Sequence, residues 1–213
     1  TYSTSESIEI TKMADSLGVD GIMIVTPYYS KPSQHGILRH FEEISKITDL
    51  PIMAYNIPGR TSTLIELETL QTLVDDIGIH SIKDAVGDFE FSKKQLELLK
   101  DKADIYSGND NQTYDFVING GVGVVSVASH VIGDEIAEMI SFAKDNDLEK
   151  AEEINMQLSN LFEAIFEEPS PGPIKKILSE SWEEVGEPLL PITSITPELA
   201  NKIRGFYKEI KEN

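Results

Sequence analysis

Lys83 is the side chain with the clearest potential for chemistry, because it closes the run from Ile79 to Lys83 that predicts a strand. Burying an ammonium costs several kcal/mol unless the charge is paired. The same burial lowers the pKa of a lysine amine and makes it a competent nucleophile for a carbonyl carbon. An ordinary lysine that extends its amine into solvent at a strand exit would leave the same pattern. Position alone therefore leaves both interpretations of Lys83 open.

Two polar side chains follow the preceding predicted strand, which ends at Tyr55. The Tyr55 phenol could relay the protons that imine formation at an amine requires. The Arg60 guanidinium, in the next loop, carries a fork of donors that suits a substrate carboxylate. Taken singly, Tyr55 is also compatible with a core aromatic residue, and Arg60 with an arginine in a surface loop.

Strands that alternate with helices must position these residues. Helical periodicity follows a capping box at Ser3 and Glu6, and strands are expected at residues 21–25, 52–55, 79–83, 103–107 and 123–127. This alternation predicts parallel βαβ units and an α/β fold. In such folds function lies at the carboxyl ends of the strands. The pattern by itself leaves open whether the sheet is doubly wound or part of a barrel.

The sequence becomes helical after Val131. Residues 132–166 predict helix throughout, with a break near residues 146–147, and further helices are expected from residue 174 and from residue 197. We expect this part to be a helical appendage packed on the sheet domain. The predicted domains are therefore residues 1–131 and residues 132–213.

The composition excludes several classes of protein. The 213 residues are 40% hydrophobic and 26% charged, which is typical of a folded domain. The absence of cysteine excludes disulfides, thiolate nucleophiles and cysteine-ligated zinc. A net charge of -19 disfavours nucleic acid and anionic membranes as partners. No apolar run is long enough to span a bilayer, so we expect a cytoplasmic protein.

Several other residues could react or bind a metal, but we expect them to have structural roles. The four histidines show no metal-ligand spacing, so no metal site is predicted. Asp84 should point to the face of its strand opposite Lys83, as a structural carboxylate. The methionines are expected to fill the core; they are Met13, Met23, Met53, Met139 and Met156.

Five segments together resemble one known family. VTPYYSKPS, MAYNIPGRT, IKDAVGD, YSGND and GVGVVSV occur in this order and run through nearly the whole chain. Their combination is similar to the dihydrodipicolinate synthase and N-acetylneuraminate lyase superfamily. The resemblance implies a (β/α)8 TIM barrel with a C-terminal helical extension, in which pyruvate is bound as an imine.

The resemblance also implies roles for individual residues. Lys83 matches the Schiff-base lysine, Tyr55 the proton-relaying tyrosine, and Arg60 the arginine that holds the carboxylate of aspartate semialdehyde in the synthase branch. Tyr29 matches a residue that reaches across a tight dimer to complete the relay of its neighbour. Two further positions match the lining of the pyruvate pocket, Gly108 and Val125.

The sequence departs from the family pattern in three places. The motif of the first family strands is absent, so we expect that about three strands and roughly 80 residues of a barrel are missing, and that this chain alone is inactive. The family's asparagine-proline loop appears here as residues 170–173, Ser-Pro-Gly-Pro. Tyr2 stands where lysine-regulated members have an asparagine, which leaves feedback by lysine open.

The function implied by the resemblance is a lyase that condenses pyruvate with aspartate semialdehyde in lysine and diaminopimelate biosynthesis. It needs no metal and no organic cofactor, and it implies a homotetramer built as a dimer of tight dimers. One alternative is another pyruvate-dependent aldolase, acting on 2-keto-3-deoxy sugar acids, against which Arg60 argues. A second alternative is an inactive truncated fragment.

Overall fold

The structure, a computed structural model, describes residues 1–212, which form two compact units. Unit 1 comprises Thr1–Asn109 and Asn119–Val125, and unit 2 comprises Asp110–Ile118 and the chain from Ser126 onward. These units are defined by contacts between residues. The predicted domain boundary after residue 131 was defined by sequence pattern, and it stays a prediction.

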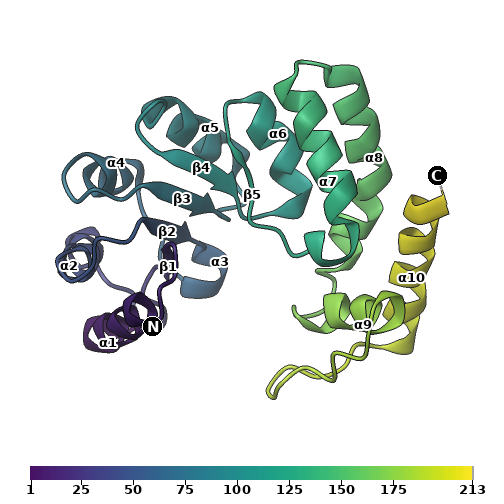
Figure 1. Cartoon of the computed structure of the whole chain (residues 1–213), viewed down its shortest axis with the longest axis horizontal. Helices are drawn as coiled ribbons and strands as arrows, with labels where there is room; N and C mark the ends of the chain where they lie inside the picture. Colours follow the sequence, from purple (N-terminus) through teal and green to yellow (C-terminus); the bar gives the residue numbers. More distant parts are fainter. Residues whose placement is uncertain (213) are drawn as a thin grey trace. The chain divides into compact units, whose positions relative to one another are not determined.

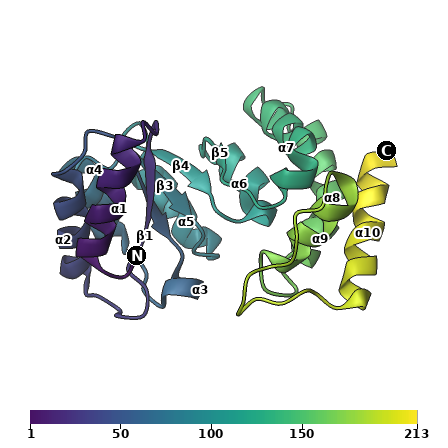
Figure 2. The same cartoon turned by 60° about the horizontal axis from the view of Figure 1, so that its bottom comes forward.

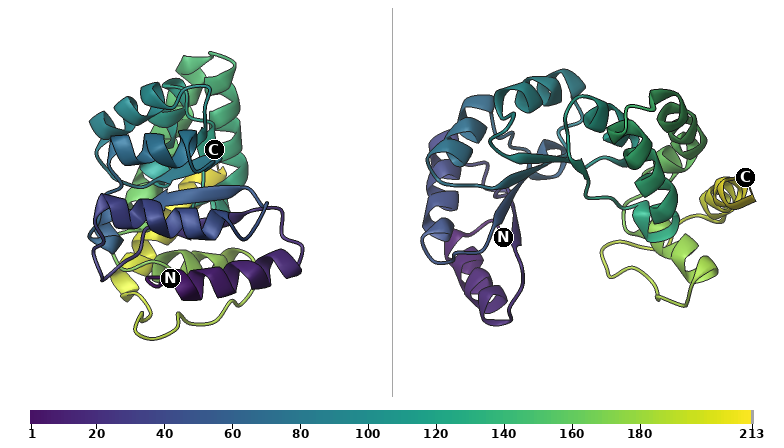
Figure 3. Two further views of the ribbon diagram at one scale, coloured as in Figure 1. Left: turned by 90° about the vertical axis from the view of Figure 1, so that its left-hand side faces the viewer. Right: turned by 45° about the horizontal axis from the view of Figure 1, so that its top comes forward.

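Unit 1 alternates strands with helices (Figure 1). Its strands are β1 (Ile22–Val25), β2 (Ile52–Asn56), β3 (Ser81–Asp84), β4 (Asp104–Ser107) and β5 (Gly123–Val124). Its helices are α1 (Thr4–Ser16), α2 (Gln34–Ser45), α3 (Pro58–Thr61), α4 (Leu67–Asp75) and α5 (Phe89–Leu98). Helices α1, α2, α4 and α5 lie along one face of the sheet, as the right-hand view of Figure 3 shows.

Side-chain caps start three of these helices, α1, α2 and α5. The Ser3 hydroxyl accepts a hydrogen bond from the Glu6 backbone N–H at the start of α1, as the capping box predicts. The Asp88 carboxylate accepts hydrogen bonds from the N–H groups of Glu90 and Phe91 at the start of α5. Each cap satisfies backbone donors that have no partner inside the helix.

All five strands are parallel and adjacent in chain order, β1-β2-β3-β4-β5. The register places Val25 beside Tyr55, Tyr55 beside Lys83, and Lys83 beside Tyr106. The prediction of an α/β fold with a parallel sheet is therefore confirmed. Within residues 1–212 this sheet is open, with β1 and β5 as its edge strands.

The two faces of this sheet differ in burial. One face packs against the helices through side chains that are at most 7% exposed, Ile24, Ala54, Ile82 and Ile105. The other face carries Tyr55 and Lys83, which are only half-buried, and Met23, which is 50% exposed. Because strand side chains alternate between faces, the position of each residue in its strand decides its environment.

The prediction that all five methionines fill the core was wrong for Met13, Met23 and Met156, which are at least half exposed. In α1, the helix buries Ser7 and Thr11, whereas Met13 is 63% exposed. The hydrophobicity of a side chain gives it a preference for burial, but the orientation of its helix or strand decides whether a neighbour covers it.

The strand expected at residues 123–127 is shorter than predicted, since β5 ends at Val124. The Val125 N–H still donates to the Ser107 carbonyl at 2.9 Å, which extends the pairing with β4 by one hydrogen bond. The apolar sequence continued the strand pattern, but the chain bends into a loop after Val125 and α7 begins at Ser129.

Unit 2 is helical. It contains a short 3-10 helix η1 (Asp110–Gln112), α6 (Thr113–Ile118), α7 (Ser129–Lys144), α8 (Leu148–Ala164), α9 (Gly172–Ser181) and α10 (Pro197–Glu212). Helix α8 packs against α7 and α10 (Figure 2), which confirms the helical character predicted for this region. The break expected near residues 146–147 separates α7 from α8.

The Asp110 carboxylate organises the start of α7. It accepts hydrogen bonds from the Ser126 hydroxyl and from the N–H groups of Val127 and Ala128, the last two at 3.1 and 3.2 Å.

No helix within residues 1–212 is both long and apolar enough to cross a bilayer.

Candidate active site

The carboxyl ends of β2 and β3 bring Tyr55 and Lys83 together. These two residues are register partners on adjacent strands, so their side chains leave the same face of the sheet. The Lys83 Nζ lies 4.2 Å from the centroid of the Tyr55 ring. A half-buried amine is thereby held beside an aromatic ring that attracts cations through its face.

Gly108, directly after β4, packs closely against Lys83. A Cβ atom at this position would lie 3.1 Å from the Lys83 Cε and 2.8 Å from the Ala85 Cβ. The Gly108 N–H donates to the Asp84 carbonyl at 2.6 Å, which brings the two strand ends close together. Glycine is required here because any larger residue would displace the lysine side chain or separate the strands.

The Tyr55 phenol is suited to donate a proton. Burial raises its pKa above the ordinary value of 10.0, and the charge of the Arg60 guanidinium partly offsets this shift. The phenol is therefore protonated at neutral pH. Its hydroxyl has no hydrogen-bond partner within residues 1–212, which leaves it available to a bound molecule.

The loop after β2 holds Arg60 in place. The buried Asn56 side chain bonds to both the N–H and the carbonyl of Ile65 at 3.0 Å, which closes the loop from 57 to 65. Inside it, the Thr61 hydroxyl donates to the carbonyls of Ile57 and Thr63 at 3.0 and 2.9 Å. These hydrogen bonds fix the backbone of the loop and therefore the backbone position of Arg60.

Arg60 and Tyr55 line one hollow of about 430 Å³, together with Met23, Val25, Tyr28, Ile57 and Thr61. Among residues 1–212 the Arg60 guanidinium has no carboxylate partner, and the side chain is exposed. An unpaired guanidinium in an apolar hollow is a site for a planar anion such as a carboxylate.

The other two predicted site residues, Tyr29 and Val125, are not among the residues that line this hollow. Tyr29 is 91% exposed, with a left-handed backbone at φ 66°, and it does not line the hollow. Val125 lies at the end of β5, where its N–H bonds to Ser107. The roles of Tyr29 and Val125 in a substrate site therefore stay predictions.

Asp84 takes the position that strand alternation predicted. Its side chain is 1% exposed and lies on the face of β3 opposite Lys83, bonded to the Val86 N–H and the Ser92 hydroxyl at 2.8 Å each. The structural roles of Asn56 and Ser107 were not predicted from the sequence. The available signal was a polar residue directly after each strand-end residue, as in Tyr55-Asn56 and Tyr106-Ser107.

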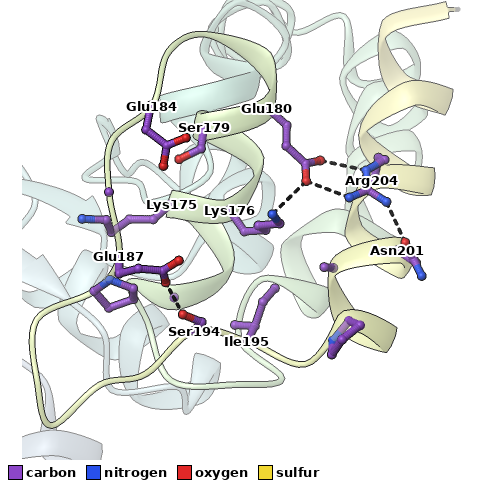
Figure 4. Close-up of a pocket in the computed structure, with 15 residues that line it drawn as sticks. Lys175, Lys176, Ser179, Glu180, Glu184, Glu187, Ser194, Ile195, Asn201 and Arg204 are labelled. Carbon is purple, nitrogen blue, oxygen red and sulfur yellow. Dashed lines mark hydrogen bonds and ion pairs between the residues drawn. The ribbon is translucent and has the colours of Figure 1, made fainter.

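A second hollow, of about 390 Å³, lies beside α9 and α10 within unit 2 (Figure 4). Three of its charged side chains, Lys176, Glu180 and Arg204, are paired with one another. Arg204 binds both oxygens of Glu180 at 2.7 and 2.8 Å, and Lys176 contacts the same carboxylate at 3.2 Å. The Arg204 guanidinium lowers the pKa of Glu180 from its ordinary 4.5 to about 2. This cluster joins two helices. Residues 1–212 contain no group of three or more His, Cys, Asp or Glu side chains that could hold a metal ion.

Comparisons with known proteins identify relatives of this chain. A curated relative from Desulforudis audaxviator, named 4-hydroxy-tetrahydrodipicolinate synthase, is 39% identical over 208 residues, which cover 98% of this chain and 71% of the relative. Relatives with this name are lyase enzymes.

Two solved structures extend the comparison to the fold. A chloride-inhibited dihydrodipicolinate synthase from Acinetobacter baumannii, complexed with pyruvate, superposes with a TM-score of 0.94 at 33% identity, covering 99% of this chain and 72% of that one. A monomeric dihydrodipicolinate synthase variant gives a TM-score of 0.96 at 33% identity, covering 99% and 71%. A profile described as the dihydrodipicolinate synthetase family matches residues 1–210. On these matches, the chain belongs to the dihydrodipicolinate synthetase family.

Proposed function

We propose that this chain carries the active site of a Schiff-base lyase that condenses pyruvate with aspartate semialdehyde on the route to lysine and diaminopimelate. The observation that carries the proposal is the Lys83 amine 4.2 Å from the centroid of the Tyr55 ring at the carboxyl ends of adjacent strands. The names of the relatives and the pyruvate-bound neighbour support the substrates.

The first half of the reaction takes place at Lys83. Its neutral amine attacks the ketone carbon of pyruvate, and the Tyr55 phenol protonates the oxygen that leaves as water, which gives an imine. The Tyr55 phenolate then takes a proton from the methyl group, which restores the phenol and gives an enamine. The protonated imine nitrogen accepts the electron pair, so the proposal includes no metal and no organic cofactor.

The second half joins the two substrates. The enamine carbon attacks the aldehyde carbon of aspartate semialdehyde, and a proton is delivered to the new alkoxide. The amino group of the semialdehyde then attacks the imine carbon, which closes the ring and releases Lys83. Arg60 would hold the semialdehyde carboxylate, because its guanidinium is unpaired within residues 1–212 and lines the hollow beside Tyr55.

We propose further that the five strands are part of a (β/α)8 barrel in a longer chain. Two observations support this: the chain spans 71% of the length of its relative, and the sheet face that carries Met23 and Lys83 is only partly covered. A closed barrel would fill its interior with side chains from that face. On this proposal, residues 1–213 expressed alone show no synthase activity, whereas the full-length gene product does.

Tyr29 would act between subunits. Its ring is 91% exposed and does not line the hollow of its own chain, as expected of a residue that completes a neighbour's proton relay. This role requires at least a dimer, and we propose a homotetramer built as a dimer of tight dimers. Tyr29→Phe should reduce turnover without loss of pyruvate binding if the relay is shared, and sedimentation of the full-length protein would report its assembly.

The decisive experiment is reduction with borohydride in the presence of pyruvate, which converts an imine at a lysine into a stable secondary amine. Intact mass and peptide mapping of the full-length protein should place one pyruvate-derived adduct on Lys83. Lys83→Arg keeps the charge and should abolish the adduct, whereas Lys46→Arg, at an exposed ion pair of α2, should leave it unchanged.

An adduct on a different lysine would overturn the site. A correct adduct combined with turnover of sugar-derived aldehydes in preference to aspartate semialdehyde would retain the imine mechanism but replace the proposed second substrate.

A further inference from the structure

A row of buried polar side chains crosses the sheet one residue beyond the row that contains Tyr55 and Lys83. The register places Asn56 beside Asp84, and Asp84 beside Ser107. All three are at most 1% exposed. Polar groups in this environment are destabilising unless they are hydrogen-bonded, so their partners indicate what the row does.

Each side chain of this row binds the loop that follows its own strand. Asn56 bonds to Ile65 at 3.0 Å, Asp84 to the Val86 N–H at 2.8 Å, and Ser107 to both backbone groups of Asn109 at 2.8 and 3.2 Å. The row therefore fixes the directions in which the chain leaves β2, β3 and β4. These are the strand ends that carry Tyr55, Lys83 and Gly108.

Asp84 differs from the other two members because it carries an ionisable group and has the largest number of partners in different segments. One carboxylate oxygen accepts from Val86 in the turn after β3, and the other accepts from the Ser92 hydroxyl on α5 at 2.8 Å. Its backbone carbonyl accepts from the Gly108 N–H at 2.6 Å. One residue thus joins the turn, the covering helix and the neighbouring strand end.

The adjacent residue depends on all three connections. The Lys83 side chain has several rotatable bonds, so its backbone and its packing must determine where the amine lies. Gly108 supplies that packing, since even a Cβ there would lie 3.1 Å from the Lys83 Cε. A shift of the β3 end relative to Gly108 would therefore move the amine relative to the Tyr55 ring.

We propose that Asp84 is a positioning residue for Lys83, whose buried carboxylate fixes the end of β3 and the turn after it and so holds the amine beside Tyr55. The inference rests on the proposed function of Lys83 as the imine-forming residue. Asp84 itself touches no substrate, because it lies on the opposite face of the strand.

The test compares three variants in the full-length protein. Asp84→Ala removes both carboxylate bonds, and Asp84→Asn keeps an acceptor for Val86 and a polar partner for Ser92. Leu99→Ala removes a buried side chain at the end of α5, where the chain leads back to the amino end of β4, so it lowers stability far from the strand ends in question. Unfolding in denaturant gives the stability of each variant, and pyruvate-dependent borohydride trapping gives the rate of imine formation.

At saturating pyruvate, Asp84→Ala should slow trapping by at least about tenfold, because small misplacements of a reacting group cost up to about a hundredfold. Asp84→Asn should restore most of this rate. Leu99→Ala should slow trapping less than about twofold even where it is the less stable protein, because the amine keeps its position. Equal slowing by Asp84→Ala and Leu99→Ala at equal loss of stability would show a role in folding only and overturn the proposal.

A second measurement tests the positioning of Lys83 by Asp84 independently of the proposed imine formation at Lys83. Reductive methylation with formaldehyde measures the accessibility and reactivity of the Lys83 amine relative to the other lysines without any use of pyruvate. A wild-type protein that gave no pyruvate adduct would overturn the imine function. A Lys83 methylation rate that differed between wild type and Asp84→Ala would still support positioning, whereas an unchanged rate would overturn it.

Discussion

Two hollows within residues 1–212 differ in how some of their charged groups are used. Beside α9 and α10, Arg204 and Lys176 both contact Glu180, so those charges are satisfied inside the chain. In the hollow at the end of β2, the Arg60 guanidinium and the Tyr55 hydroxyl have no such partner within residues 1–212. Groups satisfied internally support the fold, and groups left unpaired at a structured position are available to a ligand. Changes in the first hollow should therefore affect stability, and changes in the second should affect catalysis.

The largest effect on catalysis is expected from Tyr55→Phe. Removal of the hydroxyl eliminates a general acid, which is typically worth about 10²–10⁴-fold in rate, whereas the ring that packs beside Lys83 remains. Turnover with both substrates should fall by this factor while the Michaelis constant for pyruvate stays close to that of wild type. Tyr207→Phe, on α10, is the matched control and should leave turnover unchanged. An active Tyr55→Phe enzyme would remove Tyr55 from the proton relay.

A smaller but still large effect is expected from Gly108→Ala. The new methyl group would lie within 3.1 Å of the Lys83 Cε, the Asp84 carbonyl and the Ala85 Cβ. Displacement of the amine should slow borohydride trapping roughly 10–100-fold, and overpacking should cost about 1–3 kcal/mol of stability. Gly205→Ala, in open space on α10, tests the same substitution without a collision and should affect neither. Normal trapping by Gly108→Ala would mean that the contact does not position Lys83.

Arg60→Ala should change the use of one substrate only. Loss of a hydrogen bond to a charged group costs roughly 1.5–3 kcal/mol, so the Michaelis constant for aspartate semialdehyde should rise at least about tenfold. The constant for pyruvate should stay within about twofold, because its imine forms at Lys83. Arg39→Ala removes an arginine that is paired on α2 and should alter neither constant. Equal weakening for both substrates would reject the assignment of Arg60 to the semialdehyde carboxylate.

The smallest effect is expected in the other hollow. Arg204→Gln should lower the free energy of unfolding only slightly, since the ion pair with Glu180 is partly exposed to solvent. Turnover should not change. Lys93→Gln breaks a more exposed pair on α5 and should have no measurable effect on stability. A loss of turnover in Arg204→Gln at intact stability would contradict the assignment of this hollow to the fold.

The same ion pair predicts a pH dependence. The pKa of Glu180 is lowered in the folded chain from 4.5 to about 2, so the folded state favours the ionised carboxylate. Its contribution to stability is complete above pH 4.5 and is lost as the pH falls through about 2. Wild type and Arg204→Gln should therefore differ in unfolding free energy at pH 6 and converge toward pH 2. A difference that persisted at the lower pH would indicate a packing effect of Arg204.

The sequence by itself determined the parallel βα order and the approximate positions of the five strands. Alternating apolar runs predicted five strands because local side-chain patterns reflect burial. The positions of Tyr55 and Lys83 at the ends of neighbouring strands followed from the same pattern, and the structure confirms their proximity.

Only the tertiary structure decided which side chains of the strands and helices are buried by their neighbours. Met13 and Met23 are apolar yet at least half exposed, because no neighbour within residues 1–212 covers them. The close contact between Gly108 and Lys83 and the buried row through Asp84 depend on register between strands distant in sequence. A sequence pattern describes one segment at a time, whereas a contact between segments depends on how their backbones are placed relative to each other.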